Sequence, residues 1–197
     1  IEREYLGSHF IAGDSAIGSY VDAYGKPYLT RISSPSGERT ELVRDRGVLR
    51  SVDQYDAADQ KMASILFLRD GQGRITGIYT PENVSPDGSP SGPASIQYEY
   101  DAVGNLVKVH KLTDAGAPGA AVYDTTTYLY EHPRFPHLLT EIVDPRGLSV
   151  MRAEFDAAGR LIGTVDASGY RTAIQRDIAG RTETVFDRLG QPTTLAY

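Results

Sequence analysis

The 197-residue sequence contains no cysteine and no tryptophan. Without cysteine, the chain can form no disulfide, no thiolate metal site and no cysteine nucleophile. No apolar run approaches the roughly 18 residues that a membrane-spanning helix requires, so we expect no membrane span. Basic residues are in the minority, with 20 Lys and Arg against 26 Asp and Glu and a net charge of −6. They are scattered along the chain, which argues against a nucleic-acid partner.

The residues that are present favour β-structure. The chain has 13 Tyr, 20 Gly and 11 Pro, and 40% of its residues are hydrophobic, which is enough to bury a core. Its apolar runs are short, and no long stretch with helical periodicity also carries helix caps. Such a composition is typical of short strands joined by turns, and it predicts an all-β protein.

An Asp-x-x-Gly motif recurs near the C-terminus as DAAG, DASG, DIAG and DRLG. The closing glycines follow one another at intervals of 10, 11 and 10 residues. Further copies lie upstream, among them DAVG at residues 101–104. We therefore predict structural turns at five pairs of residues: Asp101 and Gly104, Asp156 and Gly159, Asp166 and Gly169, Asp177 and Gly180, and Asp187 and Gly190.

The chemistry of the motif is that of a tight turn. An Asp carboxylate can accept the backbone N–H two residues further on, and Gly tolerates a positive φ that a side chain would disfavour. On this basis Gly180→Val is expected to cost about 1–3 kcal/mol. Strands of about six residues between such short turns can pair only with antiparallel neighbours. The sequence therefore predicts an antiparallel β-meander.

The repeats divide the chain into three regions. Residues 1–80 form a divergent repeat region, in which the motif is weaker around Gly25, Gly37, Gly47 and Gly73 and Asp59 replaces a glycine. Residues 81–95 form an insertion rich in Pro, Gly and Ser, and residues 96–197 form the regular repeat region. We expect one continuous sheet rather than two independent cores.

In several of these motifs an aromatic residue directly precedes the Asp and a polar residue directly follows the Gly. The copies are YDAVGNL from Tyr100, FDAAGRL from Phe155, FDRLGQP from Phe186 and a degraded YDAADQK from Tyr55. In this pattern the sequence resembles the RHS/YD-repeat family. Departures are the two Phe in place of Tyr, Asp59 in place of Gly, and the insertion.

The resemblance implies both a fold and a role. RHS/YD repeats form a β-ribbon that curves and spirals into a hollow shell enclosing a toxin or effector, as in bacterial polymorphic toxins and Tc toxins, and they form part of the adhesion receptor in teneurins. It implies a secreted or surface-delivered bacterial protein, a structural rather than enzymatic role, and as partners the remainder of a larger shell and its toxin cargo.

The size of the chain limits this role. At most about 16 strands fit, and a spacing of about 4.8 Å makes their sheet about 75 Å wide. A shell of about 50 Å diameter has a perimeter about twice that width. The chain is therefore expected to be one segment of a larger shell, or to self-associate through its sheet edges.

The sequence offers no catalytic constellation, and we predict no catalytic residue, metal site or cofactor. The histidines are His9, His110, His132 and His137. His132 and His137 share a Pro-containing loop, but zinc would need further ligands, for which Glu131 and Asp144 are the nearest candidates. The simpler interpretation is that His132 and His137 are ordinary surface residues of this loop. Similarly, DPRGL at Asp144 is interpreted as an ordinary turn with Pro at its second position.

Tyrosine pairs suggest an alternative function. Tyr98 and Tyr100, and Tyr128 and Tyr130, are two residues apart and so share a strand face. Such rings can stack on sugars, so an alternative is a YD-repeat adhesin that recognises a glycan or a protein through this ligand platform. Cross-strand ladders of Tyr also stabilise sheets without any ligand.

Overall fold

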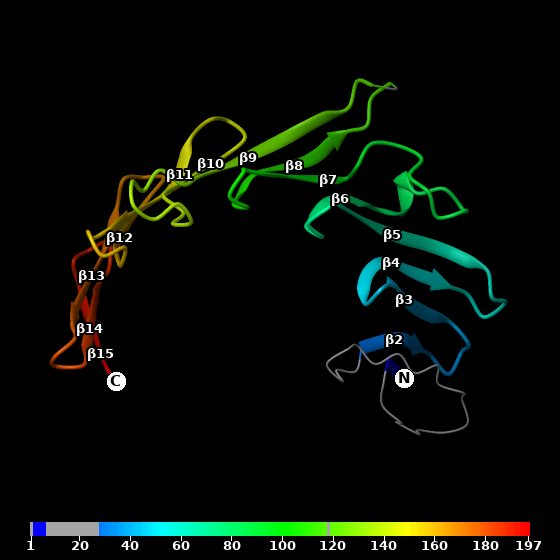
Figure 1. Cartoon of the computed structure of the whole chain (residues 1–197), viewed down its shortest axis with the longest axis horizontal. Helices are drawn as coiled ribbons and strands as arrows, with labels where there is room; N and C mark the ends of the chain where they lie inside the picture. The colour runs from blue at the N-terminus through cyan, green and yellow to red at the C-terminus, as the bar shows by residue number, and fades with distance from the viewer. Residues whose placement is uncertain (1, 7–27, 118) are drawn as a thin grey trace. The chain divides into compact units, whose positions relative to one another are not determined.

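The computed structural model describes residues 2–6, 28–117 and 119–197. His9 and the weak motif that ends at Gly25 lie outside the described residues. Almost all of the described chain is strand or tight turn, and η1 (Pro81–Asn83) is a single 3-10 turn (Figure 1). No helix in these described ranges is long and apolar enough to cross a membrane.

The strands are short and follow one another closely along the chain. They are β1 (Glu2–Leu6), β2 (Tyr28–Ser33), β3 (Arg39–Asp45), β4 (Val48–Tyr55), β5 (Lys61–Arg69), β6 (Ile75–Tyr79), β7 (Ile96–Tyr100), β8 (Leu106–Asp114), β9 (Val122–Leu129), β10 (Glu141–Val143), β11 (Ser149–Phe155), β12 (Leu161–Asp166), β13 (Arg171–Asp177), β14 (Thr182–Phe186) and β15 (Pro192–Ala196).

The strands form one sheet whose order is the order of the chain, from β1 to β15. The pairings are antiparallel, for example β3 with β4 and β13 with β14. β1 and β15 are the two ends of the sheet, so the sheet is not closed. The predicted all-β antiparallel meander is therefore confirmed.

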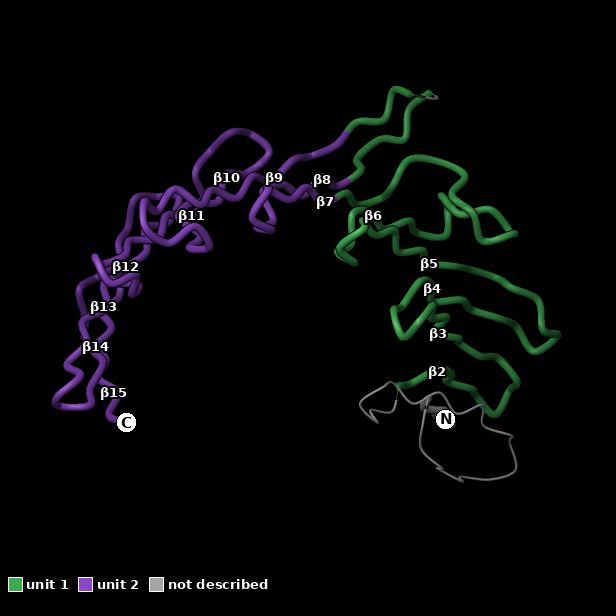
Figure 2. The backbone as a smooth tube through the Cα atoms, in the orientation of Figure 1, with its two compact units in different colours: residues 1–97, 112–122 green, residues 98–111, 123–197 purple. Residues whose placement is uncertain are grey.

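The chain divides into two compact units, shown in different colours in Figure 2. Unit 1 comprises residues 1–97 and 112–122, and unit 2 comprises residues 98–111 and 123–197. The division falls within β7, β8 and β9, whereas the 81–95 insertion lies wholly in unit 1.

The insertion is an ordered part of unit 1. Its own small turn joins the backbone of Ser85 and Ser89, and an isolated bridge pairs Val84 with Pro90. Ala94, 4% exposed, lies against Gly77 of β6, where a Cβ atom would be 3.7 Å from the Ala94 Cβ. The insertion thus packs back onto the sheet near the strands that it connects.

Neither unit has a large hydrophobic core within the described residues. Only Leu66 and Ala94 are buried among their hydrophobic side chains, and none is completely buried. The apolar content of the sequence predicts a core, but a single sheet leaves most apolar side chains half-exposed. Its stability must therefore depend on backbone ladders, cross-strand pairs and turns.

Candidate functional site

The turn at Asp156 shows the geometry that recurs along the sheet. The Asp156 N–H donates to the carbonyl of Arg160 at 2.9 Å, and the Gly159 N–H donates to the carbonyl of Asp156 at 2.9 Å. Oδ1 of Asp156 accepts the N–H groups of Ala158 and Arg160, each at 2.9 Å. We call this arrangement the Asp turn. It recurs at Asp56, Asp70, Asp101, Asp144, Asp166 and Asp187.

The second carboxylate oxygen of several Asp turns is also bonded. In the Asp156 turn, Arg160 Nε donates to Asp156 Oδ2 at 2.7 Å, and Arg74 makes the same bond to Asp70. The backbone N–H of Arg160 lowers the pKa of Asp156 most, partial burial opposes this, and the Arg160 side chain lowers it further. These carboxylates are therefore ionised and occupied within their own turns.

Four of the five predicted turn pairs have this geometry, and the fifth does not. Gly180 lies in a turn, but its φ is not positive; Arg181 takes the left-handed conformation instead, at φ 51°. β13 and β14 pair as far as Asp177 and Thr182, which moves the left-handed position one residue along. The expectation that Gly180→Val acts through φ is therefore wrong. A Cβ at Gly180 would instead meet the Asp177 carboxylate, 2.9 Å from its Cγ.

Two upstream turns also differ from the simple motif. In the degraded copy, Asp59 occupies the glycine position of the Asp56 turn at φ 69° and keeps its hydrogen bonds. Gly47 instead belongs to a two-residue turn with Arg46, in which both residues have positive φ. Such a two-residue connection matches the twist of its flanking strands.

The loop between β9 and β10 is fastened to the Asp101 turn through Asn105. Asn105 is 8% exposed. Its Nδ2 donates to Asp101 Oδ2 at 2.9 Å and to the carbonyl of Pro136 at 2.7 Å. Both amide protons are thus used, so Oδ1 accepts the 2.6 Å bond from His137, whose Nδ1 must carry the proton.

The same loop also contacts the Asp156 turn. The Phe135 ring lies against Gly159, and Arg134 Nη1 donates to the carbonyl of Ala157 at 3.1 Å. His132 Nδ1 accepts the N–H groups of Arg134 and Phe135 at 3.3 and 3.2 Å. We call residues 131–138 the clip, because they join two neighbouring hairpin turns of unit 2.

The clip gives the two loop histidines structural partners. His132 holds the loop backbone and His137 bonds to Asn105. No group of three or more His, Cys, Asp or Glu that could hold a metal ion occurs in the part of the chain that the structure describes. Asp144, one of the two candidate zinc ligands besides the histidines, forms an Asp turn with Pro145 at its second position, as the sequence predicted.

A buried carboxylate lies between β4 and β5 of unit 1. Asp53 is 4% exposed; Lys61 Nζ donates to its Oδ2 at 2.7 Å and Ser64 Oγ to its Oδ1 at 2.6 Å. Burial alone would raise the pKa of Asp53, but hydrogen bonds from Lys61, Ser64 and Ser51 outweigh it and hold the pKa below its ordinary value. The sequence does not indicate this cluster, because an isolated Asp in a strand gives no local signal.

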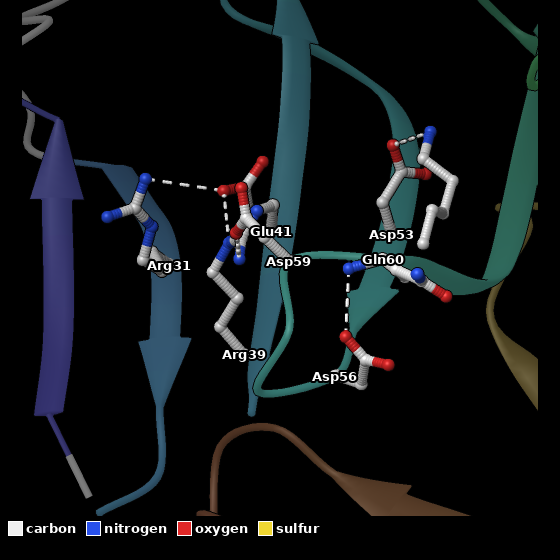
Figure 3. Close-up of polar contacts among 8 residues, drawn as sticks. Arg31, Arg39, Glu41, Asp53, Asp56, Asp59 and Gln60 are labelled. Carbon is white, nitrogen blue, oxygen red and sulfur yellow. Dashed lines mark hydrogen bonds and ion pairs between the residues drawn. The ribbon is translucent and has the colours of Figure 1, made fainter. Parts of the chain in front are cut away.

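Charged side chains alternate across the neighbouring strands (Figure 3). Glu41 of β3 accepts bonds from Arg31 at 3.2 Å and from Arg39 at 2.8 Å, and Arg39 also bonds to Asp59. The Arg39 guanidinium stacks on the Tyr55 ring, 4.0 Å from its centroid. These contacts pair opposite charges across the sheet and resemble a stabilising ladder rather than a reactive centre.

The four tyrosines of the predicted ligand platform are all half-buried. Tyr98 and Tyr100 lie in β7, Tyr128 lies in β9 opposite Ile142, and Tyr130 follows that strand. Burial and the nearby Asp101 raise the pKa of Tyr130. In the described part of the chain the exposed tyrosines are others, namely Tyr170 and Tyr197.

Comparison with known proteins gives similarity to solved structures alone. No family model and no curated protein matches the sequence. The Tc holotoxin pore of Photorhabdus luminescens is 13% identical with a TM-score of 0.41, over 90% of this chain and 11% of that chain. The TcdB2–TccC3 complex is 11% identical with a TM-score of 0.39, over 85% and 12% of the two chains. The chain thus spans about a tenth of the length of these proteins.

Proposed function

We propose that this chain is a non-enzymatic wall segment of an RHS-repeat, toxin-like protein whose shell encloses a toxin or effector. The observation that carries the proposal is the Asp turn, which recurs seven times with one hydrogen-bond pattern in a sheet that follows the chain. A repeated turn of this kind adds one hairpin at a time, which is how a continuous wall can be extended.

The lack of a large core in the described residues also supports a wall. A globular β-domain of this length normally buries the inner faces of two packed sheets. In the described ranges the strands form a single sheet, whose end strands β1 and β15 each pair with only one neighbouring strand. A sheet end of this kind can accept a further strand. The motif resemblance to RHS/YD repeats supplies the rest of the proposal, namely the enclosed toxin or effector and delivery outside the bacterial cell.

A structural rather than enzymatic role accords with how the polar groups are used. The carboxylates of the Asp turns bind their own backbone N–H groups, and His132 and His137 serve the clip. Asp53 is neutralised by Lys61. A catalytic acid or base needs a free position facing a substrate, and these groups are engaged in intramolecular bonds.

The proposal is tested on the protein encoded by the complete reading frame that contains this chain. Limited proteolysis is compared between the intact protein and a variant lacking residues 98–197, with both products identified by mass spectrometry. We expect the non-repeat segment to be protected in the intact protein and cleaved in the variant. Equal cleavage of that segment in both proteins, or a reading frame with no segment besides repeats, contradicts enclosure.

A binding assay separates the wall from the adhesin alternative. Saturable binding of the intact protein to a glycan array, lost in Tyr128→Ala but retained in Tyr197→Ala, would support the adhesin and its predicted platform. The wall function predicts no such binding, because the four platform tyrosines are half-buried within the sheet.

A further inference from the structure

Positive charge is concentrated at one place in unit 1. Between residues 28 and 97 there are eight Lys and Arg and nine Asp and Glu. The β3–β4 and β5–β6 turns and the strand ends beside them carry five of the eight basic residues and only two of the nine acids, Asp45 and Asp70. The net charge of these turns and strand ends is therefore +3, from five basic and two acidic residues. The rest of this segment has three basic and seven acidic residues and a net charge of −4. The five basic residues are Arg44, Arg46, Arg50, Arg69 and Arg74.

A cleft of about 430 Å³ lies between these two hairpin ends. Its apolar lining comes from Val48, Phe67 and Leu68, of which Val48 is 42% and Leu68 37% exposed. Arg46, Arg50 and Arg69 also line it. The volume is within the range of about 300–1,000 Å³ that is usual for ligand sites, and the lining combines apolar surface with cationic groups.

Arg69 carries a charge that the described chain does not neutralise. Its Nη1 donates to the carbonyl of Gly73 at 2.8 Å and its Nη2 contacts the carbonyl of Leu49 at 3.5 Å, while its buried Nε has no hydrogen-bond partner. No carboxylate of the described residues forms an ion pair with Arg69. Two carbonyl contacts hold the guanidinium in place while its charge stays available to an anion.

The backbone conformation of Arg46 also indicates that its guanidinium is available to an anion. It takes φ 48° in the two-residue turn with Gly47, where Asn, Asp or Gly would be favoured. No hydrogen bond or ion pair joins its side chain to the described residues. The strained backbone is thus tolerated without any intramolecular gain from the guanidinium, which is a pattern associated with functional positions. The third arginine, Arg50, has its Nη1 3.8 Å from Asp45 Oδ2, which is at the outer limit of an ion pair.

We propose that this cleft, lined by Arg46, Arg50 and Arg69 over Val48 and Phe67, binds an acidic peptide segment that also carries an apolar side chain. Carboxylates would pair with the arginines, and the apolar side chain would cover the exposed floor. Asp45 and Asp70 also line the cleft and would repel a densely charged polyanion, which favours a peptide over nucleic acid or polyphosphate. This binding does not depend on the wall function.

The probe is a fluorescent hexapeptide with Leu-Phe at its centre and two Asp and two Glu around it, titrated with the full chain by fluorescence anisotropy. We expect saturable binding that weakens as salt is raised, and at least tenfold weaker binding of the peptide with Asn and Gln instead. Arg69→Gln should weaken binding about tenfold, whereas Arg188→Gln, at an exposed turn of unit 2, should not change it.

Arg46→Gly keeps the test valid if Arg69→Gln unfolds the hairpin. Glycine suits the left-handed turn, so this variant should fold at least as well while binding the peptide more weakly. Val48→Asn should weaken binding of the peptide, because it removes apolar surface from the floor of the cleft. Equal binding of the acidic and amide peptides, or equal Kd values for Arg46→Gly, Arg69→Gln and Arg188→Gln, would overturn the proposal. Tripolyphosphate displacing the peptide with no effect of Val48→Asn would show an unspecific anion site and would overturn it too.

Discussion

The Phe135 ring of the clip lies directly against Gly159, so closely that a Cβ atom at position 159 would be 2.7 Å from its Cε2. Real Cβ atoms essentially never come so close to another carbon. The glycine of this Asp turn is therefore fixed by two independent requirements, its positive φ of 78° and the ring above it.

Gly159→Ala should consequently destabilise unit 2 more than Gly169→Ala. Gly169 has φ 81° and nothing within 4 Å of its Cβ position, so its substitution reports backbone strain alone, about 1–2 kcal/mol. Gly159→Ala adds steric overlap worth about 1–3 kcal/mol. Urea unfolding measures both. Phe135→Ala combined with Gly159→Ala should remove the extra cost; equal costs for the two single variants would contradict the contact.

Asn105→Ala should release the clip. The substitution leaves the Pro136 carbonyl and the His137 N–H without their partner, at a cost of about 1–3 kcal/mol. Hydrogen exchange and proteolytic cleavage should increase within residues 131–138 before the rest of unit 2 is affected. The matched control is Gln191→Ala, at the same position of the Asp187 turn, which should change stability by less than about 0.5 kcal/mol. Unchanged cleavage of the loop would show that the fastening lies elsewhere.

Arg181→Gly should stabilise the β13–β14 hairpin slightly. Arg181 has φ 51°, and left-handed backbone costs a non-glycine residue about 1–2 kcal/mol. Glycine loses about 0.5–1 kcal/mol through its greater freedom in the unfolded chain, which leaves a net gain of about 0.5 kcal/mol. Ala158→Gly, at a turn position without positive φ, should instead destabilise. Thermal unfolding compares the two, and a loss of stability in Arg181→Gly would refute the assigned conformation.

Local turn chemistry made much of the fold predictable. Asp101, Asp156, Asp166 and Asp187 lie where the motif placed them, because each turn is built from hydrogen bonds within five residues. The Asp177 motif looks the same in sequence, but the strand register of β13 and β14 decides its conformation. Register depends on the partner strand, which the motif does not contain.

Features built from distant residues could not be predicted in this way. Asn105 and His137 are 32 positions apart, and no spacing rule joins them. The basic residues looked scattered in sequence, but two hairpins bring Arg46, Arg50 and Arg69 to one cleft. Contacts of this kind follow from which turns share an end of the sheet, and that requires the whole order of strands.

The buried pair of Asp53 and Lys61 predicts a specific dependence of stability on pH. Because the pKa of Asp53 is held below its ordinary value in the folded state, its contribution is fully present above the unfolded pKa of about 3.9 and is lost as the pH falls through the folded pKa. The hydrogen bond to Asp53 raises the pKa of Lys61, so the Lys61 contribution is fully present below the unfolded pKa of about 10.4 and is lost as the pH rises through the higher folded pKa.

Asp53→Asn isolates this contribution from the other ionised carboxylates. At pH 7 it leaves Lys61 without its counter-charge and should cost about 1–3 kcal/mol. Urea unfolding of both proteins from neutral to acidic pH should show the difference shrinking below about pH 4, because the Asp53 carboxylate of the unfolded wild-type chain is then protonated before that of the folded protein. Asp124→Asn, an exposed strand carboxylate in β9, is the control and should match the wild type throughout. A difference that stays constant down to acidic pH would mean that the charge of Asp53 does not stabilise the fold.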